Sequence, residues 1–456
     1  MAKINPSIFK EYDIRGKYPE EINEDAAYKI GAGFSEYLSQ KKHFGEVVVG
    51  YDARLSSPAL FGAFLQGVLD SGRDVVNVGL VSSPLFYFAV NKSGAAGGVM
   101  VTASHNPKEY NGLKLVREGG LSVYKKDGLP EVEALSSLEI PRKIRTGKII
   151  KKDFSADYIN FLKKYTDVER PLKIVADASN GSAGPILEKF LDESGIEAEK
   201  LFFKPDGHFP NHSPNPFLPE ARKAIEEKIK NIGADLGFIF DADGDRVFFI
   251  NEKGETVESN HIYAYALDNF LESGELCLGT ASVSKIIEDV ARNKGARFER
   301  VPVGHANIKT AMRSKNARFG GELSGHFYFR DFYYSDSALL MAAHILSLIS
   351  KTDKPLSELL KPYQKYFNSG ELNFSVKNPA EVIEKLKKEY SERLPDGSQG
   401  KQSFLDGLTV EFPDWWFNIR ASKTEPLVRL VVEAQSRELM EEKAGELTGK
   451  IVSDNI

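Results

Sequence analysis

One pattern occurs three times along this chain, and it restricts the possible folds more than any other feature of the sequence. Each copy begins with an apolar stretch, at residue 47, 173 or 276, which leads through a serine-containing turn into an amphipathic stretch. The amphipathic stretch ends at Gly72, Gly195 or Gly295 and is followed by a second apolar stretch. Serine commonly caps the start of a helix and glycine its end. Each copy therefore predicts a strand–helix–strand unit, which requires a parallel or mixed sheet.

The three copies and a dissimilar tail predict four domains. From residue 373 onward, short alternating strands and charged helical stretches are typical of an antiparallel α+β domain. The expected fold class is α/β, with three similar α/β domains that contain mixed sheets and a smaller C-terminal α+β domain. The predicted domains are residues 1–148, 149–251, 252–366 and 367–456.

Composition excludes several classes of protein. The net charge of −5 argues against a dedicated nucleic-acid binder, although a small anionic ligand needs only a local basic pocket. The lone Cys277 excludes a disulfide scaffold and a cysteine-based zinc site, and its apolar neighbours predict a small buried side chain. The longest apolar stretch, near residues 338–349, is too short to span a bilayer, and no targeting segment is visible. We therefore expect a cytoplasmic protein with neither nucleic acid nor membrane as a partner.

Three aspartates at alternate positions form the most informative short motif. Asp241, Asp243 and Asp245 follow the apolar stretch 237–240, and Gly244 allows the backbone between them to bend. Carboxylates that converge on one point repel one another unless a cation neutralises them, and Mg²⁺ prefers such oxygen ligands. The motif predicts a Mg²⁺ site.

Two alternatives for the aspartate motif fit less well. An EF-hand loop requires glycine where this chain has Arg246, and residues 247–250 are typical of a strand rather than a helix. A phosphatase of the haloacid-dehalogenase type carries its Asp-x-Asp motif near the start of its domain, whereas this motif lies beyond the middle of the chain.

A second segment presents a serine on a constrained loop. Ser104 lies between Ala103 and the polar pair His105 and Asn106, and Pro107 restrains the exit of the loop. A serine held in this way can act as a nucleophile or phosphate carrier when a metal and a base are close by. Seen alone, the segment is equally compatible with an ordinary Ser/Asn turn.

Two further segments have the residue types that bind sugars and phosphates. In the glycine-rich stretch 320–326, Glu322, Ser324 and His326 occupy alternate positions from which they can hydrogen-bond vicinal hydroxyls. His305 and Lys309 lie upstream. Residues 420–426 combine an arginine with hydroxyl side chains and loop amides, which suits a phosphate group.

Together with residues 12–16 (Tyr-Asp-Ile-Arg-Gly), these four segments resemble the α-D-phosphohexomutase superfamily, specifically its phosphomannomutase/phosphoglucomutase branch. The resemblance covers nearly the whole chain, with the motifs in order. It implies four domains around a central cleft, each contributing one motif. It also implies that Ser104 is carried as phosphoserine and that an oxygen of this group joins Asp241, Asp243 and Asp245 in holding Mg²⁺.

The resemblance further implies an isomerase that interconverts hexose 1-phosphate and hexose 6-phosphate, with mannose or glucose as the sugar. A hexose 1,6-bisphosphate would be the bound intermediate and activator, and a small hexose phosphate the binding partner. Arg15 and Arg246 would supply positive charge, and Lys114 with His305 or His326 would handle the proton of the sugar hydroxyl. The implied catalytic group is Ser104, Arg15, His105, Lys114, Arg246, His305 and His326. The implied substrate-binding group is Tyr12, His305, Lys309, Glu322, Ser324, His326, Arg420, Ser422, Lys423, Thr424 and Arg429.

Departures from the family pattern leave the sugar open. The sequence Thr424-Glu425-Pro426 is closer to the phosphoglucosamine mutases, and Lys423 adds positive charge. A phosphoglucosamine mutase and a non-catalytic sugar-phosphate binder therefore remain alternatives, and the sequence leaves monomer and dimer equally open.

Overall fold

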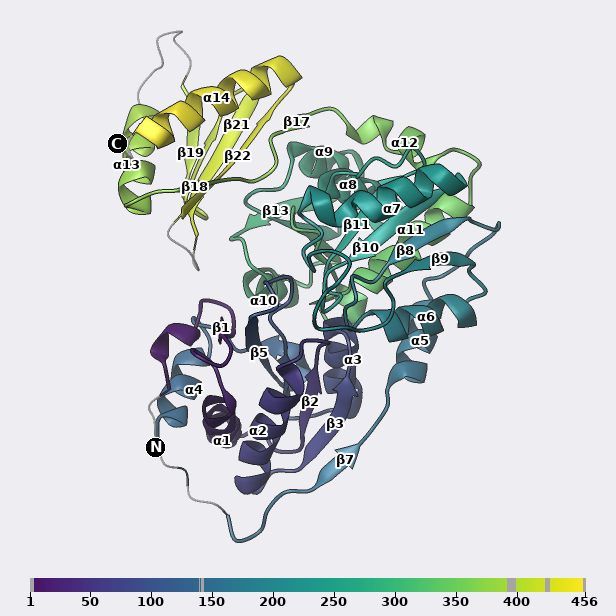
Figure 1. The fold of residues 1–456 in the computed structure, drawn as a ribbon. Coiled ribbons are helices and arrows are strands. Elements are labelled where there is room, and N and C mark those ends of the chain that lie inside the picture. The colour runs from purple at the N-terminus through teal and green to yellow at the C-terminus, as the bar shows by residue number, and fades with distance from the viewer. Residues whose placement is uncertain (1–3, 139, 141–142, 392–398, 423–426, 454–456) are drawn as a thin grey trace. The chain divides into compact units, whose positions relative to one another are not determined.

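A computed structural model describes residues 4–138, 140, 143–391, 399–422 and 427–453 (Figure 1). The chain divides into two compact units, which we describe separately: Met1–Glu258 with Ser324–Glu358, and Ser259–Leu323 with Leu359–Ile456. Each contains two of the expected sheets. No helix in the described ranges is both long and apolar enough to cross a membrane.

The first unit begins with a seven-stranded mixed sheet in the order β1-β5-β4-β2-β3-β7, with β6 paired to β5. Strands β2, β3, β4 and β7 are parallel, whereas β1 and β5 run antiparallel to their neighbours. The strands are β1 (Ile14–Lys17), β2 (Val47–Tyr51), β3 (Val75–Leu80), β4 (Gly97–Val101), β5 (Tyr110–Arg117), β6 (Leu121–Ser122) and β7 (Ile149–Lys151). The helices are α1 (Glu24–Gln40), α2 (Ser57–Asp70), α3 (Ser83–Ser93) and α4 (Leu129–Ser136).

Helices α1 and α2 pack unusually closely because each presents a glycine to the other. A Cβ atom on Gly31 would lie 2.3 Å from the carbonyl oxygen of Phe64, and one on Gly67 would lie 2.1 Å from that of Tyr28. Both distances are far below van der Waals contact, so only glycine permits this approach. The buried Phe34 of α1 and Phe64 of α2 belong to the core that this packing closes.

A second, four-stranded mixed sheet lies in the same unit, in the order β11-β10-β8-β9. Only the β10–β11 pair is antiparallel. Its strands are β8 (Ile174–Asp177), β9 (Ala198–Leu201), β10 (Leu236–Phe240) and β11 (Val247–Asn251), and its helices are α5 (Ser155–Lys163), α6 (Gly184–Glu193) and α7 (Pro219–Ile232). The unit also contains the antiparallel pair β15 (Phe327–Phe329) and β16 (Ser335–Asp336), followed by α11 (Ala338–Ser350).

The second unit contains the third copy of the repeat and the C-terminal domain. Strands β12 (Leu276–Thr280), β13 (Arg297–Val301) and β14 (Phe319–Gly321) are parallel, and they accompany α8 (Ser259–Phe270), α9 (Lys285–Asn293) and α10 (His305–Lys315). The C-terminal sheet is antiparallel throughout, in the order β17-β22-β21-β20-β19 with β18 paired to β22. Its strands are β17 (Phe367–Asn368), β18 (Leu372–Ser375), β19 (Lys401–Ser403), β20 (Leu408–Glu411), β21 (Trp415–Ala421) and β22 (Leu427–Ala434), and its helices are α13 (Pro379–Glu389) and α14 (Arg437–Ser453).

These architectures confirm the predicted fold class of three α/β domains with mixed sheets and a C-terminal α+β domain. The three glycines expected to end the repeat helices all adopt left-handed φ angles, of +81°, +66° and +66°. Of the three serine caps predicted, only Ser284 accepts a capping hydrogen bond, from the N–H of Ile286. Ser56 precedes α2 without such a bond, and Ala183 occupies the capping position of α6. Short helical segments complete the chain at α12 (Leu356–Leu359) and in the 3₁₀ turns Pro6–Ile8, Glu118–Gly120, Arg330–Phe332 and Lys361–Tyr363.

The long loop between β9 and α7 is held to the sheet by a buried ion pair. His212 Nε2 lies 3.2 Å from Oδ2 of Asp177, at the end of β8, and Nδ1 of the same ring lies 2.8 Å from the carbonyl of Ser213. Burial acts to lower the pKa of His212, but Asp177 outweighs it and the pKa is raised. Asp177 therefore favours the protonated form of His212 in the native state.

We expect His212→Gln to destabilise the protein most at acidic pH. A raised histidine pKa gives stability that is fully present below the unfolded value of about 6.5 and is lost as the pH rises through the folded value. Thermal melts at pH 6 should show the variant about 2–4 °C below wild type, with a smaller difference at pH 9. An equal difference at the two pH values would contradict a contribution from the charged pair.

Candidate active site

The three predicted aspartates converge at the turn between β10 and β11. Asp241, Asp243 and Asp245 are all buried, and each offers a carboxylate oxygen within 4.8 Å of the other two. Gly244 makes the turn possible with a φ of +70°, and a Cβ atom there would lie 2.7 Å from that of Ala183. The sequence motif is therefore a compact carboxylate cluster.

The cluster combines buried negative charge with a carboxylate oxygen that lacks a hydrogen-bond donor in the described part of the chain, and a bound cation would stabilise both. Oδ1 of Asp243 is buried without a hydrogen-bond donor among the described residues, and Oδ1 of Asp245 lies 3.3 Å from Nε2 of His326. Burial, with Asp245 and Asp243 as further causes, raises the pKa of Asp241 well above its usual range. Buried like charges and orphaned oxygens both cost free energy, and a hard divalent cation bound by oxygen removes both costs. The residues present fit such an ion.

Lys114, on β5, partly neutralises the cluster. Its Nζ donates to Oδ2 of Asp243 and to Oδ2 of Asp245, both at 2.6 Å. Although burial acts to lower it, these two carboxylates raise the pKa of Lys114 well above its usual value. The same contact, with His326 and Arg246, holds the pKa of Asp245 well below its usual range despite burial. Lys114 is thus an ammonium bound to two of the three carboxylates.

Ser104 points into this cluster. Its Oγ donates to Oδ2 of Asp241 at 2.9 Å and lies 3.3 Å from Nδ1 of His105. Partial burial, with Arg246 and Arg15 nearby, lowers the pKa of His105 well below 6.5, so this imidazole is neutral at pH 7. The side chain of Ser104 is therefore next to both the candidate metal ligands and a neutral base.

Two arginines lie beside the serine and the cluster. Arg246 Nε is 3.7 Å from Oδ2 of Asp241, and its backbone N–H donates to Oδ1 of the same residue at 3.2 Å. Arg15 donates to Oδ1 of Asn106 at 2.7 Å and is paired with Asp13. Tyr12, also predicted, is half-buried close by in sequence.

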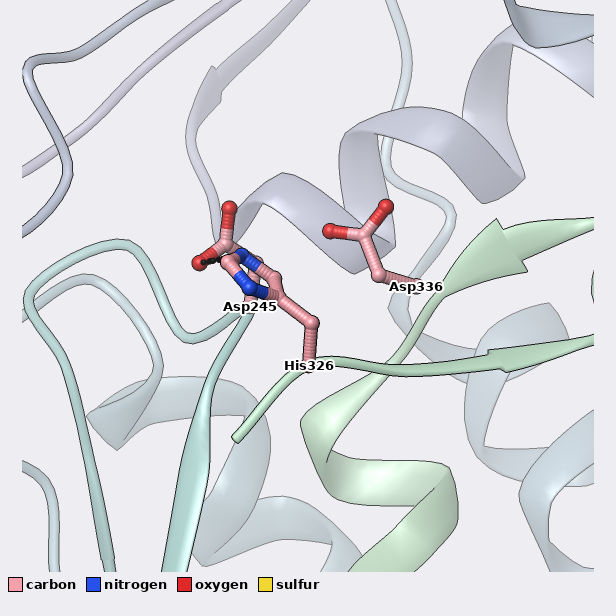
Figure 2. Close-up of side chains that lie close together, drawn as sticks. All are labelled: Asp245, His326 and Asp336. Carbon is pink, nitrogen blue, oxygen red and sulfur yellow. Dashed lines mark ion pairs between the residues drawn. The ribbon is translucent and has the colours of Figure 1, made fainter. Parts of the chain in front are cut away.

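His326 joins the cluster from the segment before β15. Its Nε2 lies 3.3 Å from Oδ1 of Asp245, and its Nδ1 is 2.9 Å from Oγ of Ser324. Figure 2 shows the imidazole turned toward Asp245, with the buried Asp336 of β16 beside them. Asp336 was missed in the sequence because it belongs to no motif and follows an aromatic stretch. Ser83 Oγ donates to Oδ2 of Asp243 at 2.6 Å. It was not predicted, because the Ser-Pro pair at this position indicates only the start of a helix.

The second unit holds the remaining candidates of the sugar segment. Glu322 follows β14, and its Oε1 accepts from the backbone N–H of Gly304 at 3.1 Å, at the start of α10. His305 begins α10, and the buried Lys309 follows one turn later on the same helix. Carboxylate, imidazole and ammonium groups are thus carried by adjoining elements of this unit.

Two arginines on neighbouring strands of the C-terminal sheet share one carboxylate. Arg420 on β21 and Arg429 on β22 are directly paired across the sheet. Arg420 donates to Oε2 of Glu371 at 2.6 Å, and Arg429 donates to Oε1 at 2.9 Å. Glu371, which belongs to none of the predicted motifs, holds both guanidiniums in one place. Ser422 directly follows β21, and its backbone N–H donates to the carbonyl of Leu427 at 2.8 Å. Lys423 and Thr424 lie outside the described residues.

We expect divalent cations to stabilise the protein through Asp243. A ligand at about 100 times its Kd adds about 2.7 kcal/mol to the stability of the native state. Magnesium chloride, compared with EDTA, should raise the melting temperature of wild type, and Asp243→Asn should remove most of that shift. The exposed Asp157→Asn on α5 is the matched control and should keep it. A full shift in Asp243→Asn would show that the ion binds elsewhere.

Comparison with known proteins gives matches along the whole chain. Four family models match in sequence order, all described as phosphoglucomutase/phosphomannomutase: alpha/beta/alpha domain I over residues 6–136, domain II over 156–254, domain III over 258–366 and the C-terminal domain over 371–450.

Individual relatives agree with these matches. The chain is 37% identical to a phosphomannomutase of Escherichia coli K12 over 448 residues, which cover 95% of this chain and 96% of that protein. It is also 37% identical to a protein named phosphohexose mutases from Xanthomonas campestris, covering 94% and 95% of the two chains. Among solved structures, a phosphoglucomutase/phosphomannomutase family protein from Burkholderia thailandensis has a TM-score of 0.88 at 31% identity, over 98% of this chain and 97% of that one.

Proposed function

The chain belongs to the phosphoglucomutase/phosphomannomutase family, and from that premise we propose that it is a mutase that moves phosphate between the 1- and 6-positions of mannose or glucose. The observation that carries the proposal is the hydroxyl of Ser104, 2.9 Å from Asp241 in a buried cluster fit for a cation. A buried serine hydroxyl beside a divalent cation site is suited to carrying a phosphoryl group.

The proposed reaction uses Ser104 as phosphate carrier in both directions. The bond from phosphorus to Ser104 Oγ breaks as a hydroxyl oxygen of the hexose monophosphate bonds to phosphorus. That hydroxyl gives up its proton to a base, and Ser104 Oγ takes up a proton to become a free hydroxyl. The product is a hexose 1,6-bisphosphate. After this intermediate turns round, its other phosphate passes to Ser104 Oγ, whose hydroxyl loses its proton. The sugar oxygen left behind takes up a proton. The sum is an isomerisation in which the enzyme regains its phosphate.

Within this reaction, Asp241, Asp243 and Asp245 would hold Mg²⁺ together with an oxygen of the phosphorylated Ser104. The ion would supply positive charge against the transferring phosphoryl group. Arg246 and Arg15 lie next to the same serine and loop, where they would add to that charge.

The geometry favours a histidine as the acceptor of the sugar proton. A base must be able to lose its own proton near neutral pH, and the raised pKa of Lys114 shows how firmly two carboxylates hold the proton there. Lys114 then serves as a fixed positive charge. His326 or His305 would take the proton, and His105 would serve the hydroxyl of Ser104.

Substrate recognition is assigned to the second unit and the loop before β15. Glu322 and Ser324 would bind sugar hydroxyls, with His305, Lys309 and Tyr12 as further contacts. Arg420, Arg429 and Ser422, with Lys423 and Thr424, would bind the phosphate that is not reacting. Glu371 keeps the two guanidiniums together before phosphate arrives, which lowers the entropic cost of binding.

Glucosamine phosphate is the second candidate substrate, because residues 424–426 read Thr-Glu-Pro. Comparing turnover of mannose, glucose and glucosamine phosphates decides between them, and the relatives favour mannose and glucose.

We expect the enzyme in the cytoplasm, because its single buried cysteine gives it no disulfide that an oxidising compartment would stabilise.

Replacing Ser104 with alanine should abolish turnover. Loss of a covalent phosphate carrier removes the reaction route itself, so kcat should fall by at least about a thousandfold. The measurement is the interconversion of hexose 1- and 6-phosphates with Mg²⁺ and a hexose 1,6-bisphosphate present. Turnover of Ser104→Ala near the wild-type rate would remove Ser104 from this role.

Replacing Arg420 with alanine should raise KM for hexose phosphate at least about tenfold, because charged hydrogen bonds to phosphate are worth roughly 1.5–3 kcal/mol. Lys401→Ala, an exposed site on β19 of the same domain, serves as control and should leave KM unchanged. Equal KM values in the two variants would exclude Arg420 from phosphate binding.

A further inference from the structure

A buried arginine, Arg54, lies three residues after the end of β2 and binds the loop that carries Ser104. Neither Arg54 nor Asp52, two residues before it, belongs to a motif predicted to carry chemistry. The side chains of both are fully excluded from solvent. A guanidinium stays charged in proteins, so burying it demands that all of its donors be satisfied.

Every donor of this guanidinium is used, and four of the five hydrogen bonds go to one short loop. Nη2 donates to the carbonyls of Ser104 and Asn106, both at 2.6 Å. Nη1 donates to those of Pro107 and Tyr110, at 2.7 and 3.0 Å. The loop thus wraps around a rigid, planar fork of donors, and no other side chain has this geometry.

The fifth donor, Nε, bonds Arg54 to the carboxylate of Asp52, which is linked through Thr102 to the backbone N–H of Ser104. Nε of Arg54 donates to Oδ2 of Asp52 at 3.1 Å, and the same oxygen accepts from Oγ1 of Thr102 at 2.7 Å. Oγ1 of Thr102 in turn accepts from the backbone N–H of Ser104 at 2.8 Å. The peptide groups on both sides of Ser104 are therefore held, the N–H through Thr102 and the carbonyl by Arg54.

These hydrogen bonds to both peptide groups of Ser104 stabilise a backbone conformation that is otherwise unfavourable. Its φ is +48°, in the left-handed region that residues with a Cβ atom rarely occupy. Such a conformation persists only where the surroundings enforce it. Here it accompanies the 2.9 Å contact between Ser104 Oγ and Asp241.

The second domain of the same unit packs against this arginine. The ring centroid of Phe209 lies 5.6 Å from the Arg54 guanidinium carbon. A Cβ atom on Gly207 would lie 2.5 Å from the carbonyl oxygen of Ala53 and from the nitrogen of Leu55. Arg54 is thus held between the loop of Ser104 and the loop that follows β9.

We propose that Arg54 is a positioning residue for phosphoryl transfer: its guanidinium, anchored on Asp52, shapes residues 104–110 so that Ser104 Oγ faces the aspartate cluster. The inference rests on the proposed mutase function. Arg54 does not donate to the side chain of Ser104, so its effect is on the alignment of the serine with its reaction partners. Losing it should lower kcat and leave the KM for hexose phosphate nearly unchanged, because the proposed phosphate-binding residues belong to the other unit.

The chain offers a matched control in Arg73. This arginine is also buried in the first domain and also donates to backbone carbonyls, those of His43 at 3.0 Å and Gly45 at 2.8 Å. It differs in holding a loop that carries none of the candidate site residues. If Arg54→Ala and Arg73→Ala lower the melting temperature equally, that decrease is the general cost of removing a buried arginine that binds backbone carbonyls.

The experiment measures kcat, KM and the rate of Ser104 phosphorylation by a hexose 1,6-bisphosphate, each per folded protein. We expect Arg54→Ala to lower kcat and the phosphorylation rate at least a hundredfold, with KM within threefold of wild type. Guanidinium chloride at tens of millimolar should raise the kcat of Arg54→Ala at least tenfold. Potassium chloride at the same concentration should leave that kcat unchanged. Arg73→Ala should keep its kcat and gain nothing from guanidinium.

Other outcomes would overturn the proposal. If Arg54→Ala retains kcat within threefold of Arg73→Ala, or if its loss is a rise in KM, Arg54 does not position the serine. Should Arg54→Ala fail to fold, Arg54→Lys decides: one ammonium cannot bind four carbonyls, so its kcat should fall at least tenfold, and an unchanged kcat refutes the idea. Failure of the mutase function itself would be distinct, because wild type would then neither phosphorylate Ser104 nor turn over hexose phosphates.

Discussion

Three carboxylates buried within reach of one another are the interaction on which the first unit depends. Asp241, Asp243 and Asp245 repel each other in a setting with little water to screen them, and burial raises the pKa of Asp241 accordingly. Lys114 offsets part of that charge by bonding to two of them. The residual negative charge and the Oδ1 of Asp243, to which no described residue donates, are the features that fit the cluster to a cation.

The surrounding fold is arranged so that this charge faces a serine. Strands β10 and β11 bring the aspartates to one turn, and β5 carries Lys114 to the same place. The loop after β4 holds Ser104 in a left-handed conformation, with Arg54 and Thr102 bonded to the peptide groups on its two sides. The site therefore depends on two kinds of constraint, electrostatic in the cluster and conformational at the serine.

Sequence alone predicted the parts of this site that are local in the chain. The aspartate motif and the repeated strand–helix–strand units each lie within a few tens of residues, and local chemistry was enough to predict them. The Ser104 loop is equally local, but its role came from the resemblance to a family, because the segment alone also fits an ordinary turn. The capping residue of α6 was misread because Ala183 takes a place where serine was expected. Arg54, Asp336 and Glu371 escaped notice because their partners lie about 50 or more residues away or belong to no motif, so only the folded chain brings them together.

The most direct test of the account follows a labelled phosphate through Ser104. Wild type is incubated with a hexose 1,6-bisphosphate that carries radioactive phosphorus and Mg²⁺, the labelled residue is mapped, and unlabelled hexose monophosphate is then added as a chase. The account predicts label on Ser104 alone, and its transfer to the sugar during the chase as fast as turnover. Label on another residue, or label that stays on Ser104 while turnover proceeds, would contradict it.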